Sequence, residues 1–577
     1  MQAKYTPEIN TQIIISLLKA HNIKKVIASP GNTNVAFIGS IQNDPFFEVY
    51  SSVDERSAAY MACGLAEQSG EPVVLSCTGA TASRNYVPGM TEAYYRKLPV
   101  LALTSTQPVG RVGHNIPQVI DRDSIQNDVA RFSTTLPIVK DDEDLWECEV
   151  KANQAILELS RHGGGPVHIN LPTTYALPFK TGTVPSYRKI TRYVSKDVFP
   201  ELKGKVAVFV GSHKRWSAEE TQSLEKFCAS NNAIVLCDHT SSYKGKFRVQ
   251  FALAASQTYM DKSSYLPDIL IQIGEVSGDY ATLGITGKEV WRVNLDGELR
   301  DSTKKLTSIF EMSETEFFDR YANEMFESSY YDSCIKRLSS IRECIPEVPF
   351  SNIHVASKVA SKLPKNSILH FGILNSLRSW NLFEIDNSIE TACNVGGFGI
   401  DGILSSLLGA SLHDKDKLSF VVLGDLAFFY DMNALGNRHV GKNLRILLIN
   451  NGKGTEFTQY NHHAAFLEKD IDRFVASDGH YGQKSESLVK NYAKSLGFEY
   501  FSASNKTSLD DVIEVFTNPE VGDRPLLLEV FTDSEEESDA LQLMQTIYRD
   551  KKGILKDTTK KLIGKKGINL IKKTINK

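Results

Sequence analysis

Two polar segments in the last third of the chain follow apolar runs that have the composition of buried strands. Gly424 and Asp425 come directly after one run, and residues 450–454, which include Asn451, follow another. Open α/β sheets bind ligands at the carboxyl ends of such strands. One carboxylate, one amide oxygen and one backbone carbonyl form an oxygen site that suits Mg²⁺ when phosphate oxygens complete it. Each segment alone also fits a helix-capping Asp or an Asn-Asn-Gly turn.

The elements that must position these residues are predicted by apolar runs that alternate with helical stretches. Strand and helix in turn indicate parallel sheets covered on both faces. The sequence therefore predicts an α/β protein with three doubly wound parallel-sheet domains in series. The main strand-like runs are 25–28, 73–77, 100–104 and 167–171, then 206–211, 233–236 and 268–274, and finally 420–423, 446–449 and 526–530.

Two proline-containing stretches mark the expected domain boundaries. A loop-like stretch at 178–195 carries prolines, glycine and basic residues, and two prolines precede a new helix near 344–351. The last residues of the chain are rich in lysine, with apolar residues near helical spacing. We therefore expect domains at 1–185, 196–343 and 346–545, and a basic amphipathic tail at 550–577.

The bulk composition excludes several classes of protein. Hydrophobic residues make up 41% and charged residues 23%, as in globular proteins, and a net charge of −4 gives no global attraction to nucleic acid or membrane. No apolar run reaches the roughly 18 residues of a membrane span, and the N-terminus has no signal-peptide pattern. The 8 cysteines form no C-x-x-C pair. They predict reduced core thiols in a cytoplasmic protein.

The paired motifs resemble those of the thiamine-diphosphate-dependent decarboxylase and acetolactate synthase superfamily. Its chains carry a pyrimidine-binding, a middle and a diphosphate-binding domain, and its diphosphate motif is Gly-Asp followed after a segment by Asn-Asn. The resemblance implies thiamine diphosphate and Mg²⁺ as cofactors. It implies Asp425, the Asn451 side chain and the Lys453 carbonyl as metal ligands, with Gly424 and Leu426 beside the cofactor.

Within this superfamily the pattern is closest to the SEPHCHC synthases of menaquinone biosynthesis. Residues 29–31 (Ser-Pro-Gly), 54–61 and 399–402 carry this similarity, together with the segments 424–426 and 430–435. The similarity covers most of residues 8 to 540 and is weakest in the middle domain.

Glu55 matches the superfamily's catalytic glutamate, and Ile400 matches its bulky aliphatic support beneath the cofactor. The glutamate binds the aminopyrimidine ring and thereby promotes removal of a proton from the reactive carbon. A mostly buried carboxyl suits this task because its pKa can be raised. Glu55 would equally suit a helix start, where the dipole favours an acid. An isoleucine beside a glycine turn is also an ordinary core residue.

The turn at 77–82 resembles the strand-end turn that approaches the cofactor pyrimidine, and it implies contacts from Thr78, Gly79 and Asn85. Gln118 matches a glutamine that faces the reaction intermediate. His114 could shuttle a proton near neutral pH, although a loop histidine is commonly a surface residue.

The sequence departs from the SEPHCHC synthases where those enzymes bind carboxylates with arginine. Thr33, Gln107, Trp380 and Val395 stand at four such positions. Arginine binds a carboxylate through two parallel hydrogen bonds, so four losses predict a different substrate. The remaining candidates for substrate binding are Arg84, which could equally form a surface ion pair, and Asn375, Ser376 and Arg378.

The sequence thus predicts decarboxylation of a 2-oxo acid with thiamine diphosphate and Mg²⁺, with or without ligation of the activated aldehyde to an acceptor. SEPHCHC synthase is the alternative, and a non-catalytic cofactor-binding scaffold is a second one. The resemblance implies a homodimer or homotetramer, and no nucleic-acid partner is expected. The tail at 550–577 predicts peripheral contact with an anionic membrane or a partner, or else a solvated terminus.

Overall fold

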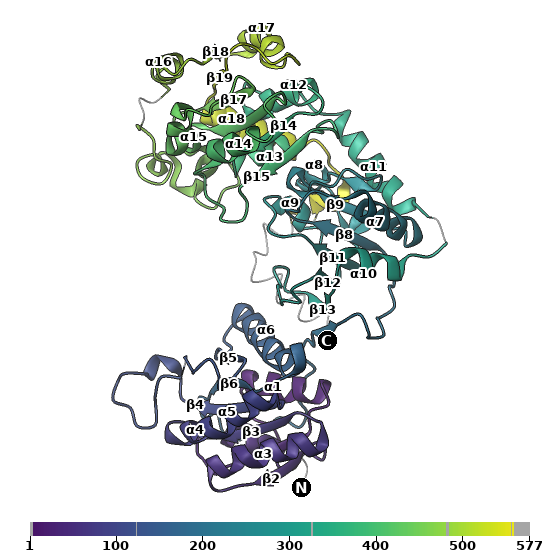
Figure 1. The fold of residues 1–577 in the computed structure, drawn as a ribbon, viewed down its shortest axis with the longest axis vertical. Helices are drawn as coiled ribbons and strands as arrows, with labels where there is room; N and C mark the ends of the chain where they lie inside the picture. The colour runs from purple at the N-terminus through teal and green to yellow at the C-terminus, as the bar shows by residue number, and fades with distance from the viewer. Residues whose placement is uncertain (1–3, 123, 325–326, 481–483, 556, 559–577) are drawn as a thin grey trace. The chain divides into compact units, whose positions relative to one another are not determined.

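The computed structural model describes residues 4–122, 124–324, 327–480, 484–555 and 557–558 (Figure 1). The chain forms two compact units, residues 1–198 with 296–311, and residues 199–295 with 312–577. Residues 559–577, which make up most of the predicted basic tail, lie outside the described part of the chain.

The first unit is built on a parallel sheet with strand order β2-β1-β3-β4-β6-β5. Its strands are β1 (Lys25–Ala28), β2 (Glu48–Ser51), β3 (Val73–Cys77), β4 (Val100–Thr106), β5 (Phe132–Thr135) and β6 (Val167–Pro172). Its helices are α1 (Ile9–Ala20), α2 (Val35–Ile41), α3 (Glu55–Ser69), α4 (Thr81–Asn85), α5 (Val87–Arg96) and α6 (Asp142–Glu158).

Alternate residues of these strands belong to two different hydrophobic cores. Val74 packs in a core with side chains of α1 and α6, whereas Val73 and Leu75 pack in a core with side chains of α3 and α5. Successive side chains of a strand point to opposite faces of the sheet. Helices therefore cover both faces, which explains why the strands are apolar throughout.

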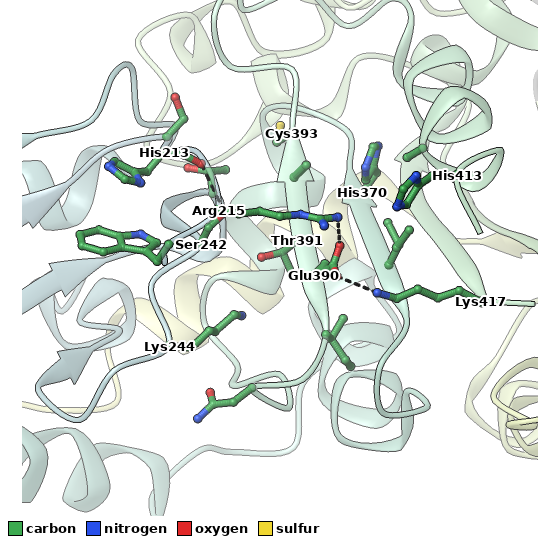
Figure 2. A pocket seen from close by; sticks show the side chains of 18 of the residues that line it. His213, Arg215, Ser242, Lys244, His370, Glu390, Thr391, Cys393, His413 and Lys417 are labelled. Atoms are coloured by element: carbon green, nitrogen blue, oxygen red, sulfur yellow. Dashed lines mark hydrogen bonds and ion pairs between the residues drawn. The ribbon is translucent and has the colours of Figure 1, made fainter. Parts of the chain in front are cut away.

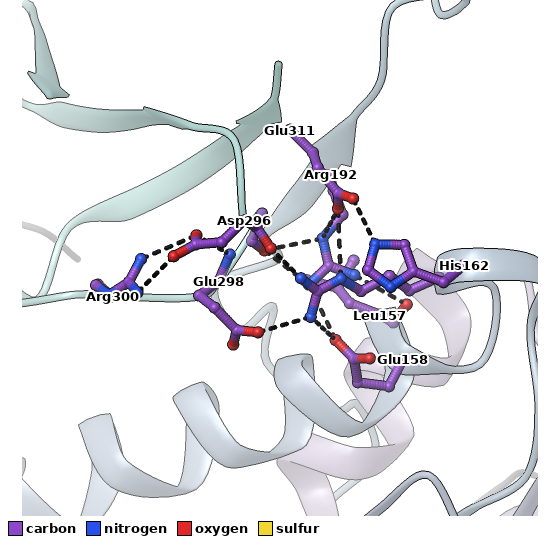
Figure 3. A network of polar contacts seen from close by, with 10 residues as sticks. Leu157, Glu158, His162, Arg192, Asp296, Glu298, Arg300 and Glu311 are labelled. Carbon is purple, nitrogen blue, oxygen red and sulfur yellow. Dashed lines mark hydrogen bonds and ion pairs between the residues drawn. The ribbon is translucent and has the colours of Figure 1, made fainter. Parts of the chain in front are cut away.

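A segment from farther along the chain, residues 296–311, completes the first unit. It contains β13 (Leu306–Glu311), which pairs in parallel with β7 (Thr191–Tyr193). Arg161 Nη1 lies 3.1 Å from Glu158 Oε1 and 2.9 Å from Glu298 Oε1. Figure 3 shows Glu158 and Glu298 within this network of polar contacts. The ion pair with Glu298 attaches the returning segment to the first domain, and Glu158 holds Arg161 in place for it.

The second unit contains a middle sheet and a third sheet. The strands of the middle sheet that lie in this unit have the order β10-β9-β8-β11-β12, and the third sheet has the order β15-β14-β16-β17-β19-β18. The middle strands are β8 (Val206–Val210), β9 (Ile234–Cys237), β10 (Arg248–Val249), β11 (Ile269–Ile273) and β12 (Glu289–Asn294). The third-sheet strands are β14 (Ile368–Phe371), β15 (Glu390–Cys393), β16 (Ser419–Gly424), β17 (Leu444–Asn450), β18 (Glu499–Ala503) and β19 (Leu526–Phe531).

Helices flank both of these sheets. Around the middle sheet lie α7 (Ala218–Ser230), α8 (Ala252–Ala255), α9 (Tyr280–Leu283), α10 (Glu314–Tyr321) and α11 (Ser329–Arg342). The third sheet is accompanied by α12 (Asn352–Val359), α13 (Asn375–Trp380), α14 (Ile403–Ser411), α15 (Asp425–Asp431), α16 (Leu488–Ser495), α17 (Lys506–Phe516) and α18 (Ser534–Gln545). The predicted class of three parallel-sheet α/β domains is confirmed. Among the described residues, no helix is long and apolar enough to cross a membrane.

Candidate active site

Glu55 is the first residue of α3, where it lies half-buried. The helix begins there because the Asp54 side chain accepts a hydrogen bond from the Ser57 backbone N–H (2.7 Å). Asn85 at the end of α4 donates from Nδ2 to Glu55 Oε2 over 3.4 Å. Two of the predicted site residues, from different helices, are therefore in contact.

The predicted turn at Thr78 and Gly79 follows β3 and lies against two other loops. Thr78 Oγ1 is 2.7 Å from Thr33 Oγ1, and the Gly79 N–H donates to the same Thr33 oxygen over 3.2 Å. A methyl group at Gly79 would lie 2.9 Å from the backbone carbonyl oxygen of Gln118. Glycine is thus required for the close approach of the Gln118 loop. The structure brings Thr78, Gly79 and Gln118 together at the carboxyl end of this sheet.

Asp425 joins the ends of β16 and β17 in the second unit. Its carboxylate accepts hydrogen bonds from the backbone N–H groups of Leu426 (2.8 Å) and Gly452 (2.6 Å). The side chain is buried, and burial raises the pKa of this carboxyl to about 6. A buried carboxylate without a cation is unfavourable, so this position favours a bound positive charge.

Asn451 and Lys453 supply further oxygen atoms in the same loop. Asn451 Oδ1 is buried and has no hydrogen-bond partner among the described residues. The Lys453 carbonyl accepts hydrogen bonds from the Thr455 N–H (2.9 Å) and, over 3.4 Å, from the Thr455 hydroxyl, which can rotate away when a metal ion binds. No group of three or more His, Cys, Asp or Glu side chains in the described chain could hold a metal ion. One carboxylate, one unpaired amide oxygen and one carbonyl fit Mg²⁺ that also binds phosphate oxygens.

Comparisons with known proteins agree with this geometry. Residues 10–126 match the family described as thiamine pyrophosphate enzyme, N-terminal TPP binding domain. A 2-succinyl-5-enolpyruvyl-6-hydroxy-3-cyclohexene-1-carboxylate synthase of Bacteroides fragilis is 31% identical over 565 residues, covering 93% of this chain and 98% of the relative. The chain belongs to this family of thiamine-diphosphate enzymes.

Two more relatives carry the same name. The synthase of Phocaeicola vulgatus is 31% identical over 559 residues, covering 93% of this chain and 98% of that protein. The synthase of Flavobacterium johnsoniae is 29% identical over 546 residues, with 90% and 95% covered. The similarity of this thiamine-diphosphate enzyme to its relatives therefore spans all three sheets.

Ile400 lies between the two cores of the third sheet. It is half-buried and packs against the hydrophobic cluster on each face of that sheet. The adjoining Gly402 has φ +80° and precedes α14. A half-buried isoleucine in a loop is consistent with a side chain that packs beneath the cofactor of a thiamine-diphosphate enzyme. This role of Ile400 stays a prediction.

We expect Ile400→Ala to reduce kcat by about 100-fold while the chain stays folded, because a displacement of about 1 Å between reacting groups costs that much. Ile403→Ala is the matched control, since Ile403 is buried in the core alone. It should lower the melting temperature by removing core packing, with kcat of the folded enzyme unchanged. Steady-state kinetics and thermal melts measure both effects. Equal kcat values for the two variants would contradict the support role.

His114 is not joined to the rest of the pyrimidine half. It is exposed, and within the described residues no hydrogen bond or ion pair connects it to Glu55 or Thr78. Its proton-shuttle role rests on the sequence alone.

Arg84, the other predicted residue of this region, donates a hydrogen bond from Nη2 to the Asp121 carbonyl over 3.0 Å. This bond links Arg84 to the loop that follows Gln118.

Arg122 is a residue of this region that the sequence did not single out. Its side chain is buried, and Nη2 donates to Asn170 Oδ1 (2.6 Å) and to the Ser105 carbonyl (3.2 Å). Its Nε and Nη1 atoms are buried without a partner in the described chain. Burial lowers the pKa of this guanidinium to about 10. The Ser105 carbonyl also accepts from Thr33, so Arg122 adjoins the Thr78 cluster.

The predicted substrate residues of α13 are already engaged within the chain. Arg378 forms an ion pair with Glu456, and the Asn375 amide can bond the same glutamate through its carboxylate (2.6 Å) and backbone N–H (3.0 Å). Ser376 is buried. Trp380 is fully buried and donates from Nε1 to an Asn352 side chain, so this position serves the core.

Proposed function

We propose that this thiamine-diphosphate enzyme decarboxylates a 2-oxo acid and joins the remaining fragment to an acceptor. The observation that carries the proposal is the oxygen set of the diphosphate half, in which Asp425 is buried and Asn451 Oδ1 is unpaired. The cofactor, when bound, supplies an electron sink for the carbon that loses carbon dioxide.

The chain's own residues then have separate tasks. Asp425, Asn451 and the Lys453 carbonyl would hold Mg²⁺, which neutralises the diphosphate. Glu55 would hold a proton at the aminopyrimidine ring, and the Asn85 contact keeps its carboxylate in place. Gln118 would face the substrate from the loop that closes over Gly79.

The first candidate reaction is the one in the printed name of the relatives. That product carries a succinyl group on a cyclohexene carboxylate. A succinyl group has four carbons and a terminal carboxylate, so 2-oxoglutarate is the 2-oxo acid that yields it after loss of carbon dioxide. The acceptor is then a cyclohexadiene carboxylate that bears hydroxyl and enolpyruvyl groups. Similarity over 93% of this chain favours this candidate.

The second candidate uses the same chemistry on a less anionic acceptor. Three observations favour it. Thr33 is buried and hydrogen-bonded to Thr78, Trp380 is fully buried, and Val395 is a core residue. None of these side chains can bind a carboxylate as an arginine does.

A panel of 2-oxo acids separates these candidates. We would measure carbon dioxide release from 2-oxoglutarate, pyruvate and a branched 2-oxo acid, with and without the cyclohexadiene acceptor, and identify products by mass spectrometry. A succinylated ring from 2-oxoglutarate supports the first candidate. Carbon dioxide release without that product supports the second. No release from any acid by the cofactor-loaded enzyme would overturn the proposal and favour a scaffold.

A further inference from the structure

A cavity of about 650 Å³ lies in the second unit, between loops of the middle sheet and the edge of the third sheet (Figure 2). Its volume falls within the range of small-molecule sites. Basic and imidazole side chains dominate its polar lining, namely His213, Arg215, Lys244, His370, His413 and Lys417.

Lys244 is the most informative of these residues. It is half-buried on the middle-domain side of the cavity, and among the described residues no hydrogen bond or ion pair reaches its Nζ atom. Burial lowers the pKa of this amine to about 8. A largely buried amine without a paired counter-ion is costly, and among the described residues no carboxylate pairs with Lys244, although the charge of Asp386 acts on it from a distance. This position therefore favours a bound anion.

The acidic side chains of the cavity do not supply that partner. Glu390 on β15 is already bound by Arg215 and, over 2.7 Å, by Lys417, as the dashed lines in Figure 2 show. With Lys244, three cations (Lys244, Arg215 and Lys417) line the cavity against two carboxylates, Glu390 and Asp414, so one positive charge is in excess. The Asp414 carboxylate accepts a hydrogen bond from the Asp416 N–H within its own loop.

Donor groups also line the opposite walls of this cavity. His370 on β14 has a buried Nδ1 atom without a hydrogen-bond partner in the described chain. Ser212 follows β8, at the carboxyl end where parallel sheets bind ligands. Thr240 follows β9, and its hydroxyl already donates to Asp238 over 2.6 Å. The cavity thus combines excess positive charge with an unused polar atom.

No residue of the diphosphate half lines this cavity, and its basic end at Lys417 lies away from that half. Lys417 precedes β16 and Asp425 follows it, so the two mark opposite ends of one strand. A strand of this length spans roughly 20 Å at about 3.3 Å per residue.

We propose that this cavity is a second ligand site, which binds a small dianion through Lys244 and the basic groups opposite it. Either a phosphate or a pair of carboxylates would supply the required charge. This inference is independent of the proposed function, because none of the residues named for catalysis lines the cavity.

Calorimetry on the full-length enzyme, saturated with thiamine diphosphate and Mg²⁺, tests the proposal with inorganic phosphate and malonate as separate probes. Saturation fills the diphosphate half, so binding there is excluded. At least one probe should bind, and Lys244→Ala should weaken it about ten-fold or more, as expected for a lost charge-assisted hydrogen bond. The probe that binds identifies phosphate or carboxylate as the ligand group.

Lys226→Ala is the matched control, since Lys226 is exposed on α7 and does not line the cavity. It should bind the probe as the wild type does, and Lys244→Arg should keep most of the affinity. The probe should also raise the melting temperature of the wild type but not of Lys244→Ala. The proposal fails if neither probe binds, or if the bound probe has equal affinity for Lys244→Ala.

Discussion

The Glu55→Gln variant should fold, bind thiamine diphosphate with wild-type affinity and lose about 100- to 10,000-fold in kcat. That range is what proton transfer by a positioned side chain contributes. The amide fills the space of the carboxylate and can still accept the Asn85 hydrogen bond, but it cannot exchange a proton with the aminopyrimidine ring. The direct measurement is hydrogen–deuterium exchange at the reactive carbon of the bound cofactor, followed by NMR.

Glu67→Gln is the control for this experiment. Glu67 lies on the same helix, α3, and forms an exposed ion pair with Arg96. An exposed pair contributes little to stability, so this variant should match the wild type in both exchange and kcat. Wild-type exchange in Glu55→Gln would show that another group performs the proton transfer.

Much of the fold follows from local sequence. Val73, Val74 and Leu75 are all apolar because helices cover both faces of the first sheet, and that run alone predicts a buried parallel strand. The return of residues 296–311 to the first unit could not be predicted. Its attachment depends on Arg161 and Glu298, which are distant in sequence, and an ion pair leaves no periodic pattern.

In the candidate site, too, some residues could be predicted from local sequence and others could not. The proximity of the Asp425 and Asn451 segments could be predicted because strand ends of a parallel sheet converge, and the hydrogen bond from the Gly452 N–H to Asp425 is consistent with that expectation. Arg122 and Lys244 could not, since each lies in a polar stretch that is typical of a surface loop. Only tertiary packing shows that Arg122 is buried and that Lys244 has no partner in the described chain.

Replacing Asp425 with asparagine should have two opposite effects. Affinity for thiamine diphosphate in the presence of Mg²⁺ should fall by at least about 100-fold, because even groups that only orient a metal ligand cost 10- to 100-fold. The unliganded protein should become more stable near neutral pH. Burial raises the pKa of the folded carboxyl from 3.8 to about 6, so ionisation above that pH disfavours the fold. The amide removes this penalty, and we expect that gain to exceed the loss of one backbone hydrogen bond, since the amide nitrogen cannot accept from an N–H.

This pair of effects distinguishes a metal ligand from a structural acid. Asp431→Asn is the control, because Asp431 on the same helix, α15, accepts hydrogen bonds from the Ser405 N–H (2.7 Å) and hydroxyl (2.6 Å). It should lower stability and leave cofactor affinity unchanged.

Calorimetry with thiamine diphosphate and Mg²⁺ measures the affinity, and thermal melts of the unliganded chains between pH 4 and about 8 measure the stability. The stability gain of Asp425→Asn should disappear as the pH falls through about 6 toward 3.8, since the wild-type carboxyl is then neutral in both states. Unchanged affinity in Asp425→Asn would remove this residue from the magnesium site, whatever its effect on stability.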